Sequence, residues 1–386
     1  MKTSISPPSN IKKSRVGFHY FPDTLHYQES DLQTWLPILQ SMNASWLVMQ
    51  SETKRAIPEH FLAGLVQAGI EPMIRMNLSL ASPPDPEELQ PILESYARWG
   101  VHIVQFFDRP NDRSAWQSTH WVQQDLVERF TNQFMPFANL SVDIGLIPAF
   151  PALMPGGSYW DTAFLRSTLE SFSRQAKSRL MDVMVLSAYA WTEGHSLSWG
   201  AGGPNKWPKS KPYFTPPDAE DHKGFRIYEW YQAAAETVLQ KKCPIILLNA
   251  GCNKDPLEDK NTVHLSDAQM EITENLYNLI NGEKVISPEN PQNMLEPIPA
   301  EVISCNFWLL SAAKGSPYEK HAWFTDDGNP QPIIDRILSQ PKQQVLSQEK
   351  SWQNTPINGS LLDQNKQHND QTVRQIQHYL LLPAYE

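Results

Sequence analysis

The sequence predicts an α/β protein of the (β/α)8, or TIM-barrel, class. Short strand-like runs alternate with amphipathic helix patterns about eight times over roughly 325 residues. Several of these runs are apolar along their whole length, as parallel strands buried on both faces are. A doubly wound open sheet is the structural alternative. It is less favoured because no glycine-rich phosphate loop follows the first strand-like run.

Eight runs rich in β-branched and aromatic residues are expected to be strands. Each is short and is followed by polar or turn-forming residues, which is the pattern of a strand that opens into a loop. Their ranges are 15–21, 44–50, 71–78, 101–107, 142–150, 183–191, 244–249 and 302–310.

Helices are expected between these strands, because apolar residues recur there at i, i+3, i+4 and i+7. The clearest one follows Asp85, a good N-cap residue, with Pro86 at the first helical position and Gly100 at its end. The other expected helices span 31–41, 58–69, 121–140, 162–182, 225–239, 266–281 and 333–338.

The chain is expected to divide into three parts. Residues 1–14 are polar and proline-bearing and are predicted to be a flexible lead-in, and residues 15–340 form the barrel. Residues 341–386 are predicted to be a polar linker and the start of a further segment. Residues 192–223, rich in Gly, Pro and Trp, are expected to be an insertion on the active face.

The composition excludes several classes of function. A net charge of -10 and a pI of about 5.6 argue against nucleic-acid and anionic-membrane partners. No apolar run of about 18 residues and no signal peptide is present, which predicts a cytoplasmic protein, or a secreted one if a leader has been removed. Cys243, Cys252 and Cys305 lack CxxC spacing and are expected to be buried thiols. No metal or cofactor is expected, and the oligomeric state is not indicated.

Polar and aromatic side chains follow the predicted strands, most densely after the fourth. In barrels of this class the loops at the carboxyl ends of the strands carry the chemistry. Flat aromatic rings suit the faces of sugars, while Asp, Asn and Arg hydrogen-bond hydroxyl groups. The alternative is that some of the aromatic side chains only fill the barrel top. The predicted binding residues are His19, Tyr20, Asn77, Arg109, Asn111, Tyr189, Trp191, Asn249 and Trp308, with Asp108 and Glu193 as tentative catalytic residues.

The run FFDRPN at residues 106–111 resembles the Asn-Glu-Pro-Asn signature that ends strand four in a large clan of retaining (β/α)8 glycoside hydrolases, particularly its xylosidase-like members. NFWLL at 306–310 is similar to the clan's aromatic sugar platform, and WFTDDG at 323–328 resembles its segment before the last helix. The resemblance covers about residues 15–340. It implies a sugar-shaped cleft and places Tyr189 near the position of a strand-seven carboxylate.

At two positions this sequence differs from the clan's pattern. The clan needs an acid and a nucleophile, two carboxylates about 5 to 5.5 Å apart. The matching positions hold Arg109 and, in LLNAG, Asn249. Arginine is no acid at neutral pH and an amide is no nucleophile for this displacement. Whether the protein is an enzyme therefore stays uncertain at this point, and the resemblance implies at most an O-glycosyl hydrolase.

Three functions follow from these residues. The first is a carbohydrate-binding pseudoenzyme for an oligosaccharide or glycan, in which Arg109 either binds an acidic group of the ligand or forms a salt bridge to Asp108, Asp112 or Glu193. The second is an active glycosidase with relocated carboxylates at Asp108 and Glu193, spaced for an inverting mechanism. A charged Arg109 beside Asp108 favours the ionised carboxylate and argues against that acid role. The third is a non-catalytic protein-interaction scaffold that uses residues 192–223 for contacts.

Overall fold

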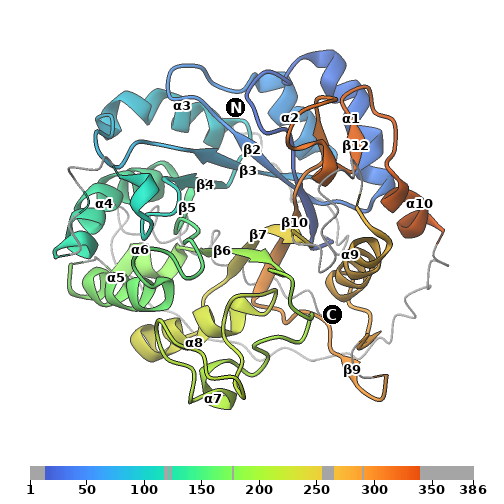
Figure 1. The fold of residues 1–386 in the computed structure, drawn as a ribbon. Helices are drawn as coiled ribbons and strands as arrows, with labels where there is room; N and C mark the ends of the chain where they lie inside the picture. The colour runs from blue at the N-terminus through green and yellow to red at the C-terminus, as the bar shows by residue number, and fades with distance from the viewer. Residues whose placement is uncertain are drawn as a thin grey trace, which may run out of the picture.

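The computed structural model describes residues 14–116, 121, 124–175, 178–253, 265–288 and 291–339 of the 386-residue chain. The predicted lead-in and the predicted C-terminal segment lie outside these residues, so the expected domain division stays a prediction. The described chain forms one ring of strands with helices around it (Figure 1).

Eight parallel strands form the inner ring, which confirms the predicted (β/α)8 fold. In space their order is β5-β4-β3-β2-β1-β10-β7-β6, and a parallel bridge between Ala149 and Val185 brings the two edges together. The strands are β1 Val16–His19, β2 Trp46–Gln50, β3 Glu71–Met76, β4 Ile103–Phe106, β5 Ile147–Ala149, β6 Leu186–Trp191, β7 Ile245–Gly251 and β10 Val302–Phe307.

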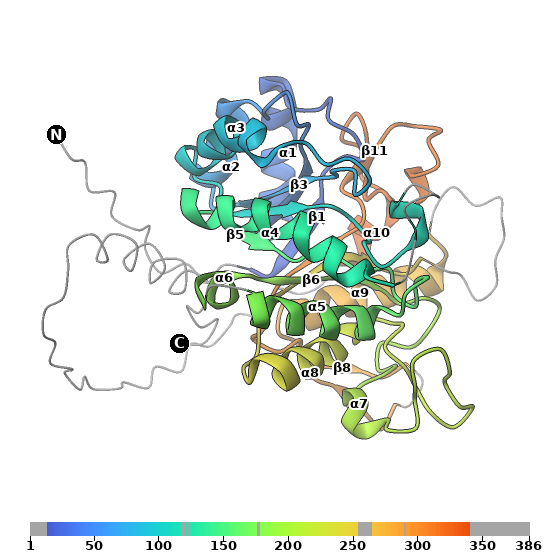
Figure 2. The same cartoon turned by 90° about the vertical axis from the view of Figure 1, so that its left-hand side faces the viewer.

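Helices cover the outside of the ring, as Figures 1 and 2 show from two directions. They bury apolar faces against the strands, and the stacked rings of Phe134 on α4 and Phe172 on α5 are one such contact, with centroids 5.5 Å apart. The helices are α1 Glu29–Ser41, α2 Glu59–Gln67, α3 Pro86–Arg98, α4 Leu126–Ile144, α5 Asp161–Gln175, α6 Ser178–Val183, α7 Gly203–Lys206, α8 Ile227–Leu239, α9 Asp267–Ile280 and α10 Pro332–Leu338.

Short elements complete the fold. The 3-10 turns η1 Arg113–Ala115 and η2 Glu319–His321 lie in loops. Strands β8 Val285–Ile286 and β9 Met294–Leu295 pair antiparallel, and β11 Ser311–Ala312 pairs with β12 Phe324–Thr325 in parallel. No helix among the described residues is long and apolar enough to cross a membrane.

Four predicted elements around the fifth unit had wrong boundaries. The expected strand 142–150 begins only at Ile147, because α4 continues to Ile144 and ends at Gly145, whose φ of 98° stops the helix. The expected helix 121–140 begins at Leu126. The expected helix 162–182 is two helices, and the following strand starts at Leu186 rather than 183. Short apolar runs such as 142–150 fit the buried face of a helix as well as a strand.

The helix after Asp85 begins where it was predicted. The Asp85 side chain accepts a hydrogen bond from the Glu87 backbone N–H at 3.0 Å, and Pro86 is the first helical residue. The three cysteines are free and buried, as expected from their spacing.

Gly17 allows β1 to pack between its two neighbours. A Cβ at this position would overlap Oδ1 of Asn306 on β10 and lie 2.6 Å from Cβ of Trp46 on β2. Asn306 cannot move away easily, because its side-chain nitrogen is bonded to the Leu247 carbonyl at 2.9 Å and to the Ser304 hydroxyl at 3.0 Å. This position therefore fixes the distance between three strands.

We predict that Gly17→Ala lowers the free energy of unfolding by about 1–3 kcal/mol, the usual range for overpacking a close-packed interior. Denaturant unfolding followed by far-UV circular dichroism measures it. The matched control is Gly64→Ala on α2, where the added methyl would meet only the movable Cδ2 of Leu32 at 2.5 Å. Equal losses in the two variants would contradict the packing argument.

Candidate functional site

A cavity of about 940 Å³ opens at the carboxyl ends of the strands. We call it the cup. All eight strands, or the loops that follow them, contribute residues to its lining. They are Pro22, Asp23, Thr24, Gln50, Ser51, Glu52, Thr53, Lys54, Arg75, Asn77, Asp108, Arg109, Met154, Pro155, Tyr189, Trp191, Glu193, Asn249, Asn253, Trp308 and Tyr318.

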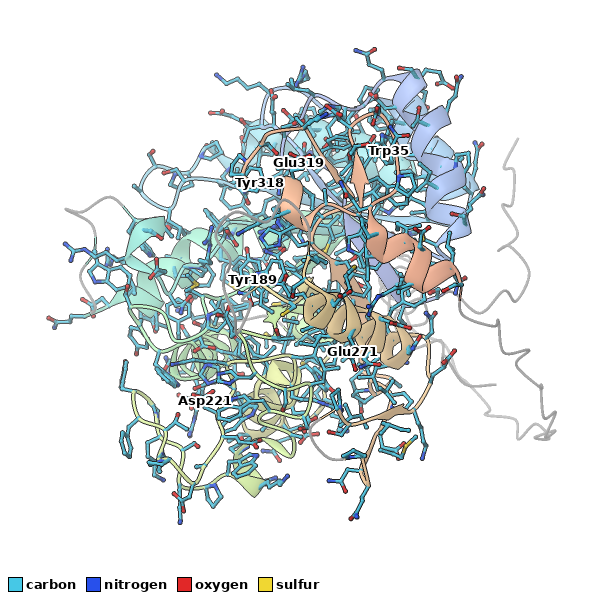
Figure 3. All side chains as sticks on the ribbon, turned by 45° about the vertical axis from the view of Figure 1, so that its right-hand side comes forward. Trp35, Tyr189, Asp221, Glu271, Tyr318 and Glu319 are labelled. Atoms are coloured by element: carbon cyan, nitrogen blue, oxygen red, sulfur yellow. The ribbon has the colours of Figure 1, made fainter. Side chains whose placement is uncertain are left out.

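Asp108 is the most heavily bonded carboxylate in the cup. Its Oδ1 accepts from Arg75 Nη2 at 3.0 Å and from Tyr189 Oη at 2.5 Å, and its Oδ2 accepts from Arg109 Nε at 2.9 Å. Arg75 also donates to Tyr189 Oη at 3.0 Å. We call these four side chains the Asp108 clamp. Figure 3 labels Tyr189 near the middle of the barrel.

Burial and the neighbouring charges shift the pKa values of Arg75 and Tyr189 in the clamp. Arg75 is almost fully buried, and although burial alone would lower its pKa, Tyr189 and Asp108 raise it above the usual value. Burial raises the pKa of Tyr189 to about 12, an effect that Asp108 reinforces and Arg75 opposes. Tyr189 is therefore a neutral hydrogen-bond donor at physiological pH, and the clamp holds one carboxylate between two guanidinium groups.

Three residues of the cup have left-handed backbones. Arg109, Glu193 and Asn249 have φ angles of 46°, 54° and 51°, a region that residues other than glycine occupy rarely. They lie after β4, after β6 and within the last residues of β7. The backbone N–H of Arg109 is held by the Ala152 carbonyl at 3.0 Å. Such conformations concentrate at functional sites because they aim side chains that a regular strand end would point elsewhere.

Asn249 lies on the β7 side of the cup beside His19 and Trp308. Its backbone N–H donates to Nε2 of His19 at 3.3 Å, and the His19 ring meets the Trp308 ring edge-on at 4.9 Å. Burial, with Arg75 nearby, lowers the pKa of His19 well below its ordinary value. His19 is therefore neutral, and Nε2 is an acceptor. The Asn249 Oδ1 atom is buried and has no hydrogen-bond partner among the described residues.

The second acidic candidate, Glu193, is tied to the loop after β7. Its Oε1 accepts from Asn253 Nδ2 at 2.9 Å, and its backbone N–H donates to Asn253 Oδ1 at 3.1 Å. Glu193 and Asp108 line the same cup. Among the described residues no group of three or more His, Cys, Asp or Glu side chains is placed to hold a metal ion.

Eight of the eleven predicted site residues line the cup, and three do not. Tyr20 is buried among aromatic side chains outside the ring, including Tyr27, Phe61 and Trp35. The other two also lie outside the lining: His19 behind Asn249, and Asn111, whose buried amide bonds the carbonyls of Met154 and Tyr159 and the N–H of Met154. Those that line the cup are Asn77, Asp108, Arg109, Tyr189, Trp191, Glu193, Asn249 and Trp308.

The predictions for Asn111 and Tyr20 failed for different reasons. Asn111 belongs to the polar loop after β4, yet its amide fixes the loop that carries Met154 and Pro155 instead of meeting a ligand. Tyr20 follows β1 directly, but strand alternation turns its ring toward α1 and α2. Arg109 forms the ion pair with Asp108 that was one of its two expected environments, and it also lines the cup.

Sequence reasoning overlooked several lining residues, and the rule it used would have found most of them. Asp23 and Thr24 follow β1, Lys54 follows β2, and Asn253 follows β7, so each lies on the predicted active face. Tyr318 lies far beyond the end of β10 and reaches the cup only because its loop returns to place its ring edge-on to Trp308 at 6.1 Å.

The strands and helices define a (β/α)8 barrel whose strand ends enclose the cup. Comparisons with known proteins support this at the level of fold. No model of a known protein family matches the sequence, and no curated protein matches it either. Many solved structures do match.

Several of these solved structures have TM-scores above 0.5, and two of them are described here. The GH39 enzyme from Xanthomonas axonopodis pv. citri has 12% sequence identity, a TM-score of 0.53, and coverage of 86% of this chain and 67% of its own. A GH39 β-xylosidase from Caulobacter crescentus has 11% identity, a TM-score of 0.52, and coverage of 87% and 72%. The chain spans 64% of a family 39 glycoside hydrolase from Bacteroides cellulosilyticus WH2. At these identities the likeness establishes the shared barrel fold.

The buried, neutral His19 makes a prediction about stability and pH. Because the pKa of His19 is lower in the folded than in the unfolded protein, the unfolded state binds more protons below about pH 6.5. The free energy of unfolding should then decrease as the pH is lowered through that window. This group contributes up to about 1.4 kcal/mol of that decrease per pH unit. We predict that His19→Gln, which keeps an amide acceptor for Asn249, reduces this slope. Denaturant unfolding between pH 5 and 7.5 measures the slope. Equal slopes for the wild type and His19→Gln would contradict the prediction that His19 is neutral in the folded protein.

Proposed function

We propose that this protein binds a saccharide in the cup and does not hydrolyse it by a retaining acid–nucleophile pair. The single observation that carries the proposal is the Asp108 clamp. A retaining mechanism needs two free carboxylates about 5 to 5.5 Å apart. At the two positions where the resemblance implies these carboxylates, this chain has Arg109 and Asn249. Asp108, the residue before Arg109, is bonded by Arg75, Arg109 and Tyr189.

The cup has the chemistry of a sugar site. Trp191 and Trp308 are half-buried and present ring surface, and Asn77 and Asn249 add amides. Two buried polar atoms have no partner among the described residues, Oδ1 of Asn249 and Nε of Arg75. An unmet acceptor or donor in a buried place costs about 1–3 kcal/mol. A hydroxyl group both donates and accepts, so a polyol ligand suits such a site.

Arg109 extends the proposal to acidic glycans. Its Nε is used by Asp108, while its two terminal nitrogens have no hydrogen-bond partner among the described residues. The side chain is 45% exposed, and the guanidinium carbon lies 6.0 Å from the centroid of the Tyr189 ring, which limits its freedom. We infer that the two terminal nitrogens receive a ligand carboxylate, as in a uronic acid, through parallel hydrogen bonds.

We predict that an oligosaccharide carrying a uronic acid binds about tenfold more tightly than its neutral counterpart, because a charged hydrogen-bonded pair contributes more than 1 kcal/mol. Arg109→Gln should abolish this preference and leave the neutral ligand's affinity nearly unchanged. Isothermal titration with both ligands, each with the wild type and the variant, measures it.

Arg113→Gln is the matched control, since Arg113 is exposed on the same loop and does not line the cup. It should retain the preference. Equal affinities for both ligands in the wild type would remove the acidic part of the proposal. Binding of neither ligand would remove the saccharide site itself.

A second candidate function is hydrolysis by Asp108 and Glu193, which line the same cup from the ends of β4 and β6. An inverting mechanism accepts carboxylates about 6.5–9.5 Å apart, with water between them. Both oxygens of Asp108 accept hydrogen bonds, from Arg75, Arg109 and Tyr189, so its position suits a base better than an acid. Glu193 would then have to be the acid.

The proposal of a binding protein predicts no release of the chromophore from aryl glycosides above the rate in buffer. Absorbance of released nitrophenol, followed with the wild type, measures this. A rate that Asp108→Asn and Glu193→Gln each reduce by at least a hundredfold would instead establish the second candidate, given that a positioned general acid or base contributes about 10²–10⁴. Folding of each variant is checked by circular dichroism.

A further inference from the structure

A second cavity, of about 600 Å³, lies outside the ring between α5, α8 and the insertion at residues 192–223. It shares no lining residue with the cup. In Figure 3 Asp221, one of its lining residues, lies well away from Tyr189. Its volume falls within the range of about 300–1,000 Å³ of small-ligand pockets. Its walls include Trp160, Thr162, Asn205, Asp221, His222 and Trp230.

One wall of this cavity is a buried Asp–His pair. His222 is 2% exposed, and its Nε2 is bonded to Oδ1 of Asp161 at 2.7 Å. Asp161 is fully buried and also accepts from the Gly156 N–H at 2.9 Å and the Tyr231 hydroxyl at 2.8 Å. Burial raises the pKa of Asp161, but His222 and these hydrogen bonds outweigh that effect and hold it below the usual value. Asp161 is thus an ionised acceptor, and Nε2 of His222 is the nitrogen that donates to it.

This arrangement leaves Nδ1 of His222 for a ligand. The atom has no hydrogen-bond partner among the described residues, while the side chain lines the cavity. The Asp161 bond fixes the orientation of the ring, so Nδ1 is held in one place. A polar atom in a fixed position on a side chain that lines the cavity is the second requirement of a binding site, after the cavity itself.

The rest of the wall favours a neutral ligand with hydroxyl groups. The His222 ring lies 5.0 Å from that of Trp160 and 6.0 Å from that of Trp230, which supply apolar surface together with alanines on α8. Arg166 is paired with Glu170 at 2.9 Å, and Asp221 accepts from Trp199 and Thr215. Lys211 and Glu236 also line the cavity, so its two basic and two acidic side chains carry opposite charges in equal number and supply little net attraction for an ionic ligand.

We propose that this second cavity binds a neutral saccharide unit, one hydroxyl group of which forms a hydrogen bond with Nδ1 of His222 while its apolar face lies toward Trp160 and Trp230. The site is separate from the cup, and the proposal does not depend on what the cup binds. The insertion that forms part of its wall would then be a binding element in its own right.

The test uses the full chain and two neutral probes, cellotetraose and xylotetraose. Ala233 on α8 lines the second cavity, and Ala233→Trp fills it while Asp161 and His222 stay unsubstituted. In isothermal titration Ala233→Trp should bind one saccharide fewer than the wild type, or lose at least tenfold in affinity at the filled site. The wild type then shows two sites if the cup also binds the probe, and one if it does not. Thr237→Trp, one helical turn further on α8, is the second variant and should give the same result.

Gln90→Trp adds an indole to the exposed face of α3 and is the control, expected to retain both sites. Trp308→Ala separates the two proposals because it removes ring surface from the cup alone. If Trp308→Ala changes nothing while Ala233→Trp removes binding, the cup proposal fails and the second site stands. A single wild-type site that both cavity-filling variants leave intact, or no binding of either probe, would overturn the second site.

Discussion

The carboxylate of Asp108, held between two arginines and a tyrosine, is the constraint on which the cup depends. Its partners come from three different strands: Arg75 from β3, Tyr189 from β6, and Arg109 from the loop after β4. Removing one partner of a buried ion pair leaves a charge without compensation, which commonly costs 3–5 kcal/mol. The clamp therefore links the ends of β3, β4 and β6 at the barrel mouth and fixes side chains that line the cup.

The clamp also bears on the proposed distinction between binding and hydrolysis. A general acid has to donate a proton to the leaving group, whereas both oxygens of Asp108 accept hydrogen bonds from neighbouring side chains. On the β7 side of the cup, Oδ1 of Asn249 is buried and has no hydrogen-bond partner among the described residues. Guanidinium and amide groups can recognise hydroxyl and carboxylate groups without changing them. These contacts are what the proposal of a binding protein rests on.

The sequence allowed the fold and much of the cup to be predicted for the same reason. Parallel strands bring their carboxyl ends to one edge, so polar residues after successive strands have to converge. Asn77, Asp108, Arg109 and Asn249 are separated by up to about 170 residues in the chain and line one cavity. The rule failed at Tyr20, where strand alternation points the ring outward, and at Tyr318, which reaches the cup by a returning loop. The strand predicted at 142–150 failed because the apolar face of α4 runs into it.

By itself the sequence determined the alternation of strands and helices, the polar residues at the strand ends, and the absence of acids from two positions where the resemblance predicts them. These are local properties, set by side-chain type and periodicity. Only the tertiary structure decided which carboxylate is bound by which cation, that Asn249 and Arg75 each keep an unmet polar atom, and that His222 and Asp161 meet beside a second cavity. Those facts depend on contacts between residues as far apart as 114 positions, as between Arg75 and Tyr189. Packing of the whole barrel, and no local pattern, sets such contacts.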